Sequence, residues 1–244
     1  MKAEKNQKEK SMEKGPIEEE SQARIMLLED ICFSYEGEIA LRHVSLTVNK
    51  GECIVLEGPN GSGKSTLLRL MNGLIFPEIG TYRFLGREIS RKSLKDVRFS
   101  KWFHQHMGYV FQNSDVQLFC SSVEEEIAFG PRQMGLSEEE VHRRTEDTIA
   151  LLELNALRDR APYHLSGGEK KKTAIACILS MNPDVLVLDE PLAGLDRKTG
   201  AWLQEFLRKL RESGKTLVLA THNELLAEAL ADRILTMNEE HGID

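Results

Sequence analysis

Short apolar runs, separated by polar or glycine-containing turns, follow one another from residue 25 onward and predict an α/β fold. Residues 25–48 hold strand-like runs on both sides of a turn formed by Glu36 and Gly37, which predicts an antiparallel sheet. Further apolar runs predict short strands at 53–57, 81–84, 107–111, 185–189, 216–220 and 234–237. The continuous run at 185–189 is expected at the centre of a parallel sheet with helices on both faces, and 234–237 at its edge.

Helical periodicity is concentrated between about residues 113 and 180, a segment that we interpret as an inserted α-helical subdomain. Within it, the run at 123–129 follows two serines that can cap a helix, and 138–154 is a longer amphipathic run. Residues 1–24, in contrast, are almost wholly polar and mix lysine with glutamate. We therefore expect a disordered charged tail at 1–24 and one domain over 25–244.

Residues 58–66 fill every fixed position of the nucleotide-binding P-loop, between a predicted strand and a predicted helix. The predicted nucleotide-binding residues are Gly58, Pro59, Asn60, Gly61, Ser62, Gly63, Lys64, Ser65 and Thr66. The glycines let successive backbone N–H groups point at a polyphosphate, and the Ser65 hydroxyl is available to a magnesium ion. At about 4 Å and an effective dielectric near 20, the Lys64 charge adds on the order of 4 kcal/mol before desolvation. A glycine-rich turn without a ligand is the disfavoured alternative.

An acidic pair, Asp189 and Glu190, ends the apolar run at 185–189. Asp189 has the place of the Walker B acid, which reaches the magnesium shell opposite Ser65. Glu190 could polarise the water that attacks the γ-phosphate, so hydrolysis is the favoured interpretation. The alternative is a carboxylate that only stabilises a helix N-terminus before Pro191.

A second glycine-bearing anion nest lies more than 100 residues after the first, at residues 165–169 (Leu-Ser-Gly-Gly-Glu). It opens a predicted helix, and helix N-termini bind phosphate groups. Alone, this segment would be interpreted as a helix N-cap with a flexible turn. Combined with the P-loop and the acidic pair, it indicates a second phosphate-binding element.

These motifs together resemble the ATP-binding cassette (ABC) family over almost all of residues 25–237. Gln112 stands at the entrance to the helical segment, residues 193–196 (Ala-Gly-Leu-Asp) match the D-loop, and Thr221 with His222 matches the switch. The resemblance implies a P-loop NTPase (RecA-like) core with a mainly parallel sheet. It also implies an N-terminal antiparallel β subdomain and an inserted α-helical subdomain.

In this family, two chains pair head to tail, and each ATP lies between the P-loop of one subunit and the signature of the other. Carried over by position, the implied catalytic residues are Lys64, Gln112, Glu190 and His222. Tyr35 would stack on adenine, and magnesium would be approached by Ser65, Gln112 and Asp189. The nucleotide of the partner subunit would be contacted by Ser166, Gly167, Gly168, Glu169 and Asp196. The implied cofactors are ATP and Mg²⁺.

Three of the implied site residues either have an alternative role or differ from the residue that is usual in the family. Tyr35 has an alternative as a packing aromatic at a strand end, and His222 as a strand-end histidine capped by its neighbours. Glu169 departs from the glutamine that is more common at the end of the signature. This change leaves the backbone nest intact, so we expect little effect on function.

Residues 110–119 and 123–131 look like the ATPases of energy-coupling factor (ECF) importers and cobalt or nickel importers. This implies an ATPase on the cytoplasmic face of the membrane that energises uptake of a vitamin or a transition-metal ion. Its partners would be a membrane coupling (T) protein, a substrate-binding membrane protein, and a second ATPase in a homodimer or heterodimer. Leu118 and Phe119 are expected to be exposed and to form the socket for a coupling helix. Packing inside the helical subdomain is the alternative.

Net charge, cysteine content and hydropathy limit the classes of protein to which this chain could belong. The formal net charge is −7, so no overall basic field favours direct nucleic-acid binding. The four cysteines are far apart and form no CxxC pair, as in a reduced cytosolic protein. No apolar stretch approaches a membrane span, so work at a membrane would need a partner. A non-transport ABC ATPase, acting in DNA repair or translation, remains the alternative, although the sequence shows no coiled coil, zinc-cysteine insertion or second cassette.

Overall fold

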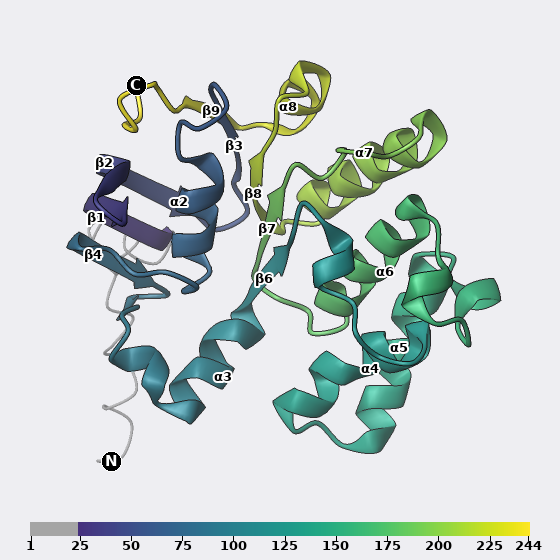
Figure 1. The fold of residues 1–244 in the computed structure, drawn as a ribbon. Helices are drawn as coiled ribbons and strands as arrows, with labels where there is room; N and C mark the ends of the chain where they lie inside the picture. Colours follow the sequence, from purple (N-terminus) through teal and green to yellow (C-terminus); the bar gives the residue numbers. More distant parts are fainter. Residues whose placement is uncertain (1–23) are drawn as a thin grey trace, which may run out of the picture.

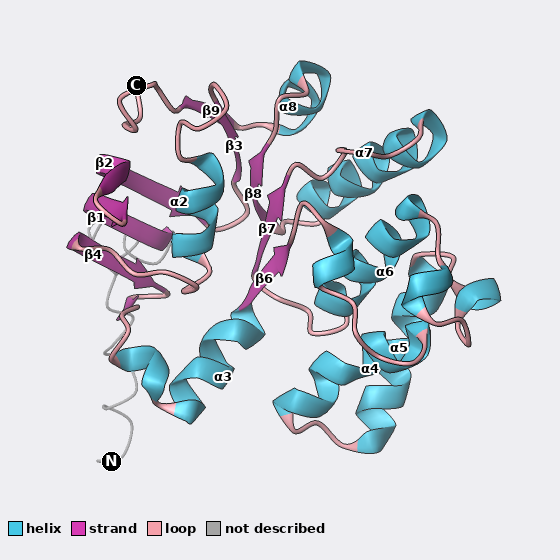
Figure 2. Cartoon of the chain, in the orientation of Figure 1, coloured by secondary structure: helices cyan, strands magenta, loops and turns pink. Residues whose placement is uncertain are grey.

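Two β-sheets and a group of helices form the structure, a computed structural model that describes residues 24–244 (Figures 1 and 2). The predicted tail lies outside the described residues except for Arg24, which the structure places in the first strand rather than in the tail. None of the helices among the described residues has the length and apolar character that crossing a membrane requires.

The smaller sheet is antiparallel, as predicted, and has the order β2-β1-β4-β5. Its strands are β1 (Arg24–Tyr35), β2 (Glu38–Asn49), β4 (Ile79–Phe84) and β5 (Arg87–Glu88). The two apolar runs before the turn at Glu36 belong to a single strand, β1, whose pairing with β2 is irregular around Ile31. Leu28 lies opposite Leu46, which places apolar side chains of the two strands on one face.

The larger sheet is parallel throughout and has the order β6-β7-β8-β3-β9. Its strands are β3 (Cys53–Glu57), β6 (Met107–Val110), β7 (Val185–Asp189), β8 (Thr216–Ala220) and β9 (Arg233–Thr236). β9 lies at the edge, as predicted. The expectation that 185–189 is the central strand is wrong by one position, because β8 is central. Both strands are fully buried, so apolarity alone does not rank them.

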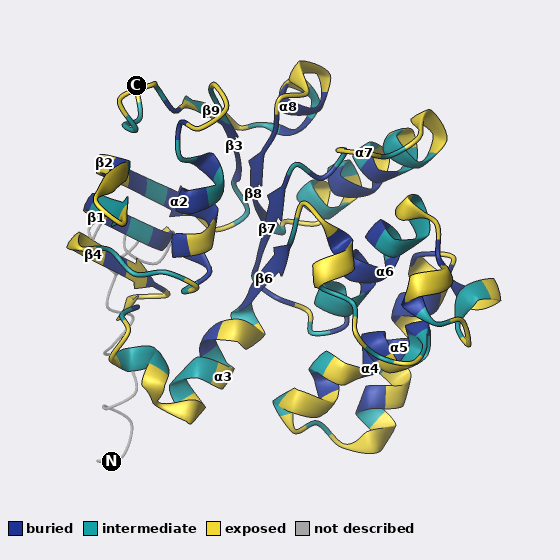
Figure 3. Ribbon diagram, viewed as in Figure 1, coloured by how far each residue is buried: buried dark blue, intermediate teal, exposed yellow. Residues whose placement is uncertain are grey.

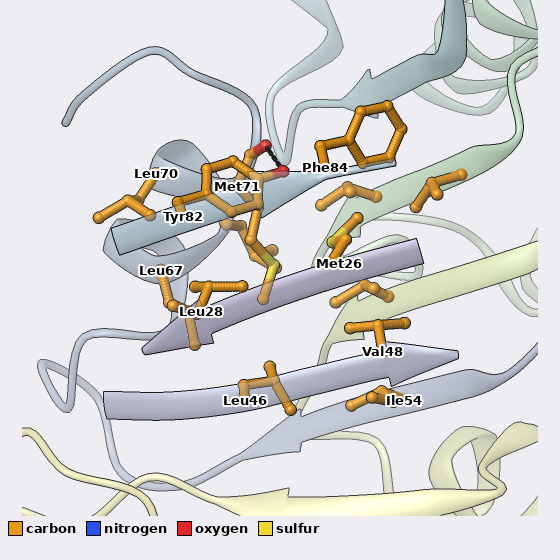
Figure 4. Close-up of a cluster of buried hydrophobic side chains, with 14 of the residues drawn as sticks. Met26, Leu28, Leu46, Val48, Ile54, Leu67, Leu70, Met71, Tyr82 and Phe84 are labelled. Carbon is orange, nitrogen blue, oxygen red and sulfur yellow. Dashed lines mark hydrogen bonds between the residues drawn. The ribbon is translucent and has the colours of Figure 1, made fainter. Parts of the chain in front are cut away.

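Alternate residues of the parallel strands supply two separate cores. The inner strands β7 and β8 are buried along their whole length (Figure 3). On one face, Ile54 and Val187 pack toward helix α2 (Lys64–Met71) and the antiparallel sheet. Figure 4 shows this cluster, in which the buried Tyr82 hydroxyl donates to the Met71 carbonyl oxygen at 2.8 Å. On the other face, strand residues pack with α7 (Arg197–Glu212) and α8 (Glu224–Leu230). Apart from the edge strand β9, which is largely exposed, the sheet is therefore buried on both sides, as its continuous apolar strands predict.

The helical subdomain consists mainly of α4 (Val123–Met134), α5 (Glu138–Leu151) and α6 (Gly167–Leu179). These helices lie together beside β6 and β7, and their core is continuous with one face of the parallel sheet (Figure 1). One further helix, α3 (Val97–His106), precedes β6 and was not predicted. Its sequence is rich in aromatic residues and histidine, which are weak helix formers, and the Asp96 side chain caps it by accepting from the Phe99 N–H.

Candidate active site

The P-loop connects the end of β3 to the start of α2, and the backbone there permits only glycine at two positions. Gly58 has φ 133° and Gly63 has φ 104°, values that L side chains rarely adopt. A Cβ atom at Gly58 would lie 2.1 Å from the Met237 carbonyl oxygen, and one at Gly63 would lie 2.3 Å from that of Ala40. The loop is thus held closely between β2 and the end of β9, with Lys64 as the first residue of α2.

Lys64 places a buried positive charge within this loop, since only 7% of the residue is exposed. Its Nζ donates to the carbonyl oxygens of Gly58 at 2.7 Å and Pro59 at 2.8 Å. Burial lowers the pKa of Lys64, and the nearby carboxylates of Glu190 and Asp189 partly oppose this shift. The ammonium group therefore lies where a polyphosphate would bind in the loop.

A cavity of about 1230 Å³ opens above the P-loop and brings most of the predicted site together. Predicted residues in its lining are Tyr35, Asn60, Gly61, Gly63, Lys64, Ser65, Thr66, Gln112, Asp189, Glu190 and His222. Residues that the sequence did not indicate also line it, among them Glu38, Arg42, Glu239, Glu240 and His241. The C-terminal ones reach the cavity because the Arg42 N–H donates to the His241 carbonyl oxygen at 2.9 Å, a long-range contact without a local sequence signal.

The carboxylate of Glu190 lies at the cavity on a strained part of the backbone. Its φ is 43°, a strained value for a non-glycine residue, and its N–H donates to the Ala220 carbonyl oxygen at 2.9 Å. Glu190 Oε1 is buried and has no hydrogen-bond partner among the described residues, while His222 Nε2 lies 3.6 Å away. A buried acceptor without a partner is costly, so this oxygen is available to bind a water or another donor.

The residues proposed for magnesium offer only oxygen ligands of the kind that this ion prefers. Ser65, Gln112 and Asp189 bring a hydroxyl, an amide and a carboxylate to the same cavity. Asp189 is buried and accepts from the Tyr109 hydroxyl at 3.4 Å, and burial raises the pKa of Tyr109 above its ordinary value. The donor set therefore fits Mg²⁺.

Tyr35 lies at the rim of the cavity and is 41% exposed. Its ring meets Phe33 edge to face, with the centroids 4.8 Å apart, and its hydroxyl bonds to Arg69, which raises the pKa of Arg69. The contact with Phe33 shows that Tyr35 contributes to packing. The side chain is also exposed to the cavity, which leaves it free to contact a bound adenine. That contact remains a prediction.

The signature segment does not line this cavity. Ser166 and Glu169 form a reciprocal capping box at the start of α6, in which the Glu169 carboxylate accepts from the Ser166 N–H at 2.8 Å. That backbone hydrogen bond lowers the pKa of Glu169. Glu169 thus has a structural task that preserves the geometry of the helix start.

The D-loop residue Asp196 stands next to the signature through Thr199 on α7. Asp196 accepts from the Thr199 N–H at 3.0 Å and from the Thr199 hydroxyl at 2.7 Å, and so caps α7. A Cβ atom at Gly168 would lie 2.9 Å from Thr199 Oγ1, so the two helix starts are in close contact. The structure therefore separates the predicted site into two parts, a P-loop cavity and a surface formed by the starts of α6 and α7.

A strand, P-loop and helix with an acidic pair two strands away define a nucleoside-triphosphate hydrolase of the P-loop class. The model of the family described as ABC transporter matches residues 41–193 of the chain. This match covers more than half of the sequence, and the chain belongs to the ABC transporter ATP-binding family. It is an ATP-hydrolysing subunit with the ABC ATPase fold, so the fold and enzyme class predicted from the sequence are confirmed.

Individual relatives span nearly the whole chain. The nickel import ATP-binding protein LarO of Lactiplantibacillus plantarum is 47% identical over 217 residues, covering 89% of this chain and 90% of LarO. CbiO1 of Clostridium perfringens, described as part of the ABC transporter complex cbiONQ, has a TM-score of 0.79 at 32% identity, covering 91% of this chain and 87% of CbiO1. The cassette MJ0796, solved as a post-hydrolysis dimer with ADP and Pi, has a TM-score of 0.79 at 29% identity, covering 90% and 97% of the two chains.

Proposed function

We propose that this chain energises an importer of the ECF or cobalt/nickel type, taking up a transition-metal ion or a vitamin through membrane partners. The observation that carries the hydrolytic part is the cavity that unites Lys64, Asp189 and Glu190, whose Oε1 has no hydrogen-bond partner within residues 24–244. Similarity to a nickel import protein and to a cbiONQ component supports the importer class. The chain would act at the cytoplasmic face of the membrane. A non-transport ABC ATPase is the weaker candidate.

In the proposed hydrolysis reaction, the residues of the P-loop cavity would act from the positions described above. The P-loop N–H groups and Lys64 would bind the β- and γ-phosphates, and Tyr35 would hold the adenine. Ser65, Gln112 and Asp189 would hold Mg²⁺, whose chemistry when bound is to neutralise charge on the phosphates. Glu190 Oε1 would accept a proton from the attacking water, and His222, 3.6 Å away, would contact the γ-phosphate.

The second half of each site would come from another ATPase subunit. Ser166, Gly168 and Asp196 lie outside the cavity of their own chain, which supports their use on the nucleotide of a partner. MJ0796, a cassette similar to this chain, was solved as a dimer bound to ADP and Pi. We infer head-to-tail pairing, as a homodimer or with a second ABC ATPase.

ATP hydrolysis measured against protein concentration tests this proposal. We expect activity to rise faster than linearly with concentration, because each site needs two chains, and light scattering to show dimers on ATP. Linear activity from a stable monomer would contradict the two-chain site. ATP binding without activity and without dimers at every concentration would instead point to an obligatory second ATPase or membrane partner.

A separate apolar groove supports docking of the membrane coupling protein. It has a volume of about 370 Å³ and lies between α3 and the helices α4 and α6, with Phe119, Phe129 and Ile178 in its lining. Phe119 is 68% exposed and meets Phe129 edge to face at 5.0 Å between centroids. The buried Glu126 carboxylate accepts from the Phe119 N–H and fixes this loop. An exposed aromatic pair beside a groove is typical of a helix-docking surface.

Leu118, in contrast, is half-buried, so the expectation that both residues are exposed is correct only for Phe119.

We predict that Phe119→Asp abolishes co-purification with a coupling protein of the cbiONQ type but changes the ATPase activity of the isolated chain less than about twofold. The reason is that a charge in the groove must be desolvated on docking. Leu225→Asp, at a position on α8 that is 71% exposed, is the matched control and should bind normally. Equal binding by both variants would place the docking surface elsewhere.

A further inference from the structure

The loop that carries Gln112 is fastened to the signature helix α6 by a buried lysine. Lys171 Nζ donates to the carbonyl oxygens of Phe111 at 3.0 Å and of Gln112 at 2.8 Å. Only 3% of Lys171 is exposed, although it lies within a run of three lysines. Burial lowers its pKa to about 8, with the Asp189 carboxylate acting in the opposite direction. Burying an ammonium group is costly, so its retention here indicates a specific task.

Two further contacts hold the same loop against α6. In the first, Gln117 Nε2 donates to the Ala174 carbonyl oxygen of α6 at 3.5 Å, while within the loop Gln117 Oε1 accepts from the Phe111 N–H at 3.2 Å. Lys170 forms an ion pair with Asp115 at 2.6 Å, but Asp115 is largely exposed. Among these contacts, the Lys171 bonds are the ones that reach the backbone of Gln112 itself.

The position of Lys171 connects the two parts of the proposed site. Lys171 lies five residues after Ser166 on one continuous helix, whereas Gln112 lines the P-loop cavity. A helix moves as a rigid element, so a displacement of the signature would be transmitted through Lys171 to the Gln112 backbone. The signature of one chain would contact the nucleotide of its partner, so this linkage would join the two sites of a dimer.

We propose that Lys171 is a positioning residue: its two hydrogen bonds fasten the backbone of Gln112 to the signature helix α6 and so set where the Gln112 side chain lies at the P-loop cavity. This inference rests on the proposed function, because it assumes that Gln112 acts in hydrolysis. Lys171 itself touches neither nucleotide nor water in this scheme.

A double-mutant cycle on the full chain tests the proposal, using Lys171→Met, Gln112→Ala and the double variant. We expect each single variant to lower kcat about 10²-fold, the loss typical of a misplaced catalytic group. The double variant should fall within about twofold of Gln112→Ala, because residues that act through one another are not additive. Multiplied losses, or a Lys171→Met variant with full activity, would overturn the proposal. Unchanged kcat in Gln112→Ala would overturn it as well.

Matched variants separate positioning from general stability. Lys170→Met removes the neighbouring lysine, and we expect kcat to change less than about twofold because its ion pair is exposed. Lys171→Arg keeps donors for both carbonyl oxygens and should recover much of the activity. If the methionine variant fails to fold, Lys171→Gln, whose shorter amide has fewer donors, takes its place in the cycle. Thermal unfolding of all variants identifies any loss that is only structural.

Hydrogen exchange without nucleotide gives a readout that does not depend on ATPase activity. We expect amides of residues 111–117 to exchange faster in Lys171→Met and to remain unchanged in Lys170→Met. Unchanged exchange in both variants would overturn the linkage. If exchange accelerates but Glu190→Gln and Gln112→Ala both retain full activity, the linkage exists and the proposed hydrolytic site is wrong, so the two failures are distinguishable.

Discussion

Glu190→Gln is expected to lower kcat for ATP hydrolysis by about 10²- to 10⁴-fold while leaving ATP binding nearly unchanged. Glutamine keeps the size and the hydrogen-bonding shape of the side chain but cannot accept a proton from water. The structure makes this loss specific, because Oε1 of Glu190 is buried beside the P-loop cavity without a partner among the described residues. Its strained backbone, with φ 43°, also indicates a position held for function rather than for folding.

Single-turnover hydrolysis and nucleotide affinity, measured on the same preparation, separate the chemical step from binding. Glu239→Gln is the matched control, since Glu239 lines the same cavity but is not assigned a part in the reaction. It should retain kcat within about threefold, well short of the loss expected for a general base. We also expect Glu190→Gln to accumulate as a dimer on ATP, because the nucleotide between the subunits is not consumed. A Glu190→Gln variant with more than a tenth of the wild-type activity would show that another group accepts the proton.

Local sequence patterns predicted the elements of the fold better than their arrangement. The strands β3, β7 and β8 are continuous apolar runs because both of their faces are buried, and this made them easy to recognise. The order of these strands is set by the crossover connections between them, which hydrophobicity does not encode. For this reason the central position was assigned to β7 instead of β8. The helix α3 was missed because its composition favours helix formation only weakly.

The candidate site likewise contains some residues that local motifs predict and others that only long-range contacts bring into place. The P-loop was predictable because its glycines, lysine and flanking elements are adjacent in the sequence. Lys171 carried no such signal, since a lysine among lysines on a helix is typical of a solvated face. Its burial arises from packing against a loop about 60 residues away. Similarly, Glu239 and His241 reach the cavity through the contact of the C-terminal segment with β2, which no motif indicates.

Lys64→Met is expected to weaken ATP binding by about 10²- to 10³-fold, since a unit-charge contact near 4 Å contributes on the order of 4 kcal/mol before desolvation. The low exposure of Lys64 reduces screening by solvent, so much of this energy is retained. The variant also leaves the carbonyl oxygens of Gly58 and Pro59 without their donor, which disfavours the observed loop geometry. Isothermal titration with ATP and magnesium measures the loss.

Lys215 supplies the matched control, because it is half-buried and, like Lys64, donates to loop oxygens. Its Nζ donates to the Pro183 carbonyl oxygen at 2.8 Å and to Asn182 Oδ1 at 2.7 Å, before the start of β7. These contacts lie at the N-terminal ends of the parallel strands, whereas the P-loop follows the C-terminal end of β3. Lys215→Met should therefore lower the free energy of unfolding but leave ATP affinity unchanged. Equal ATP affinity in wild type and Lys64→Met would mean that the backbone N–H groups of the loop bind the phosphates without help from the buried ammonium.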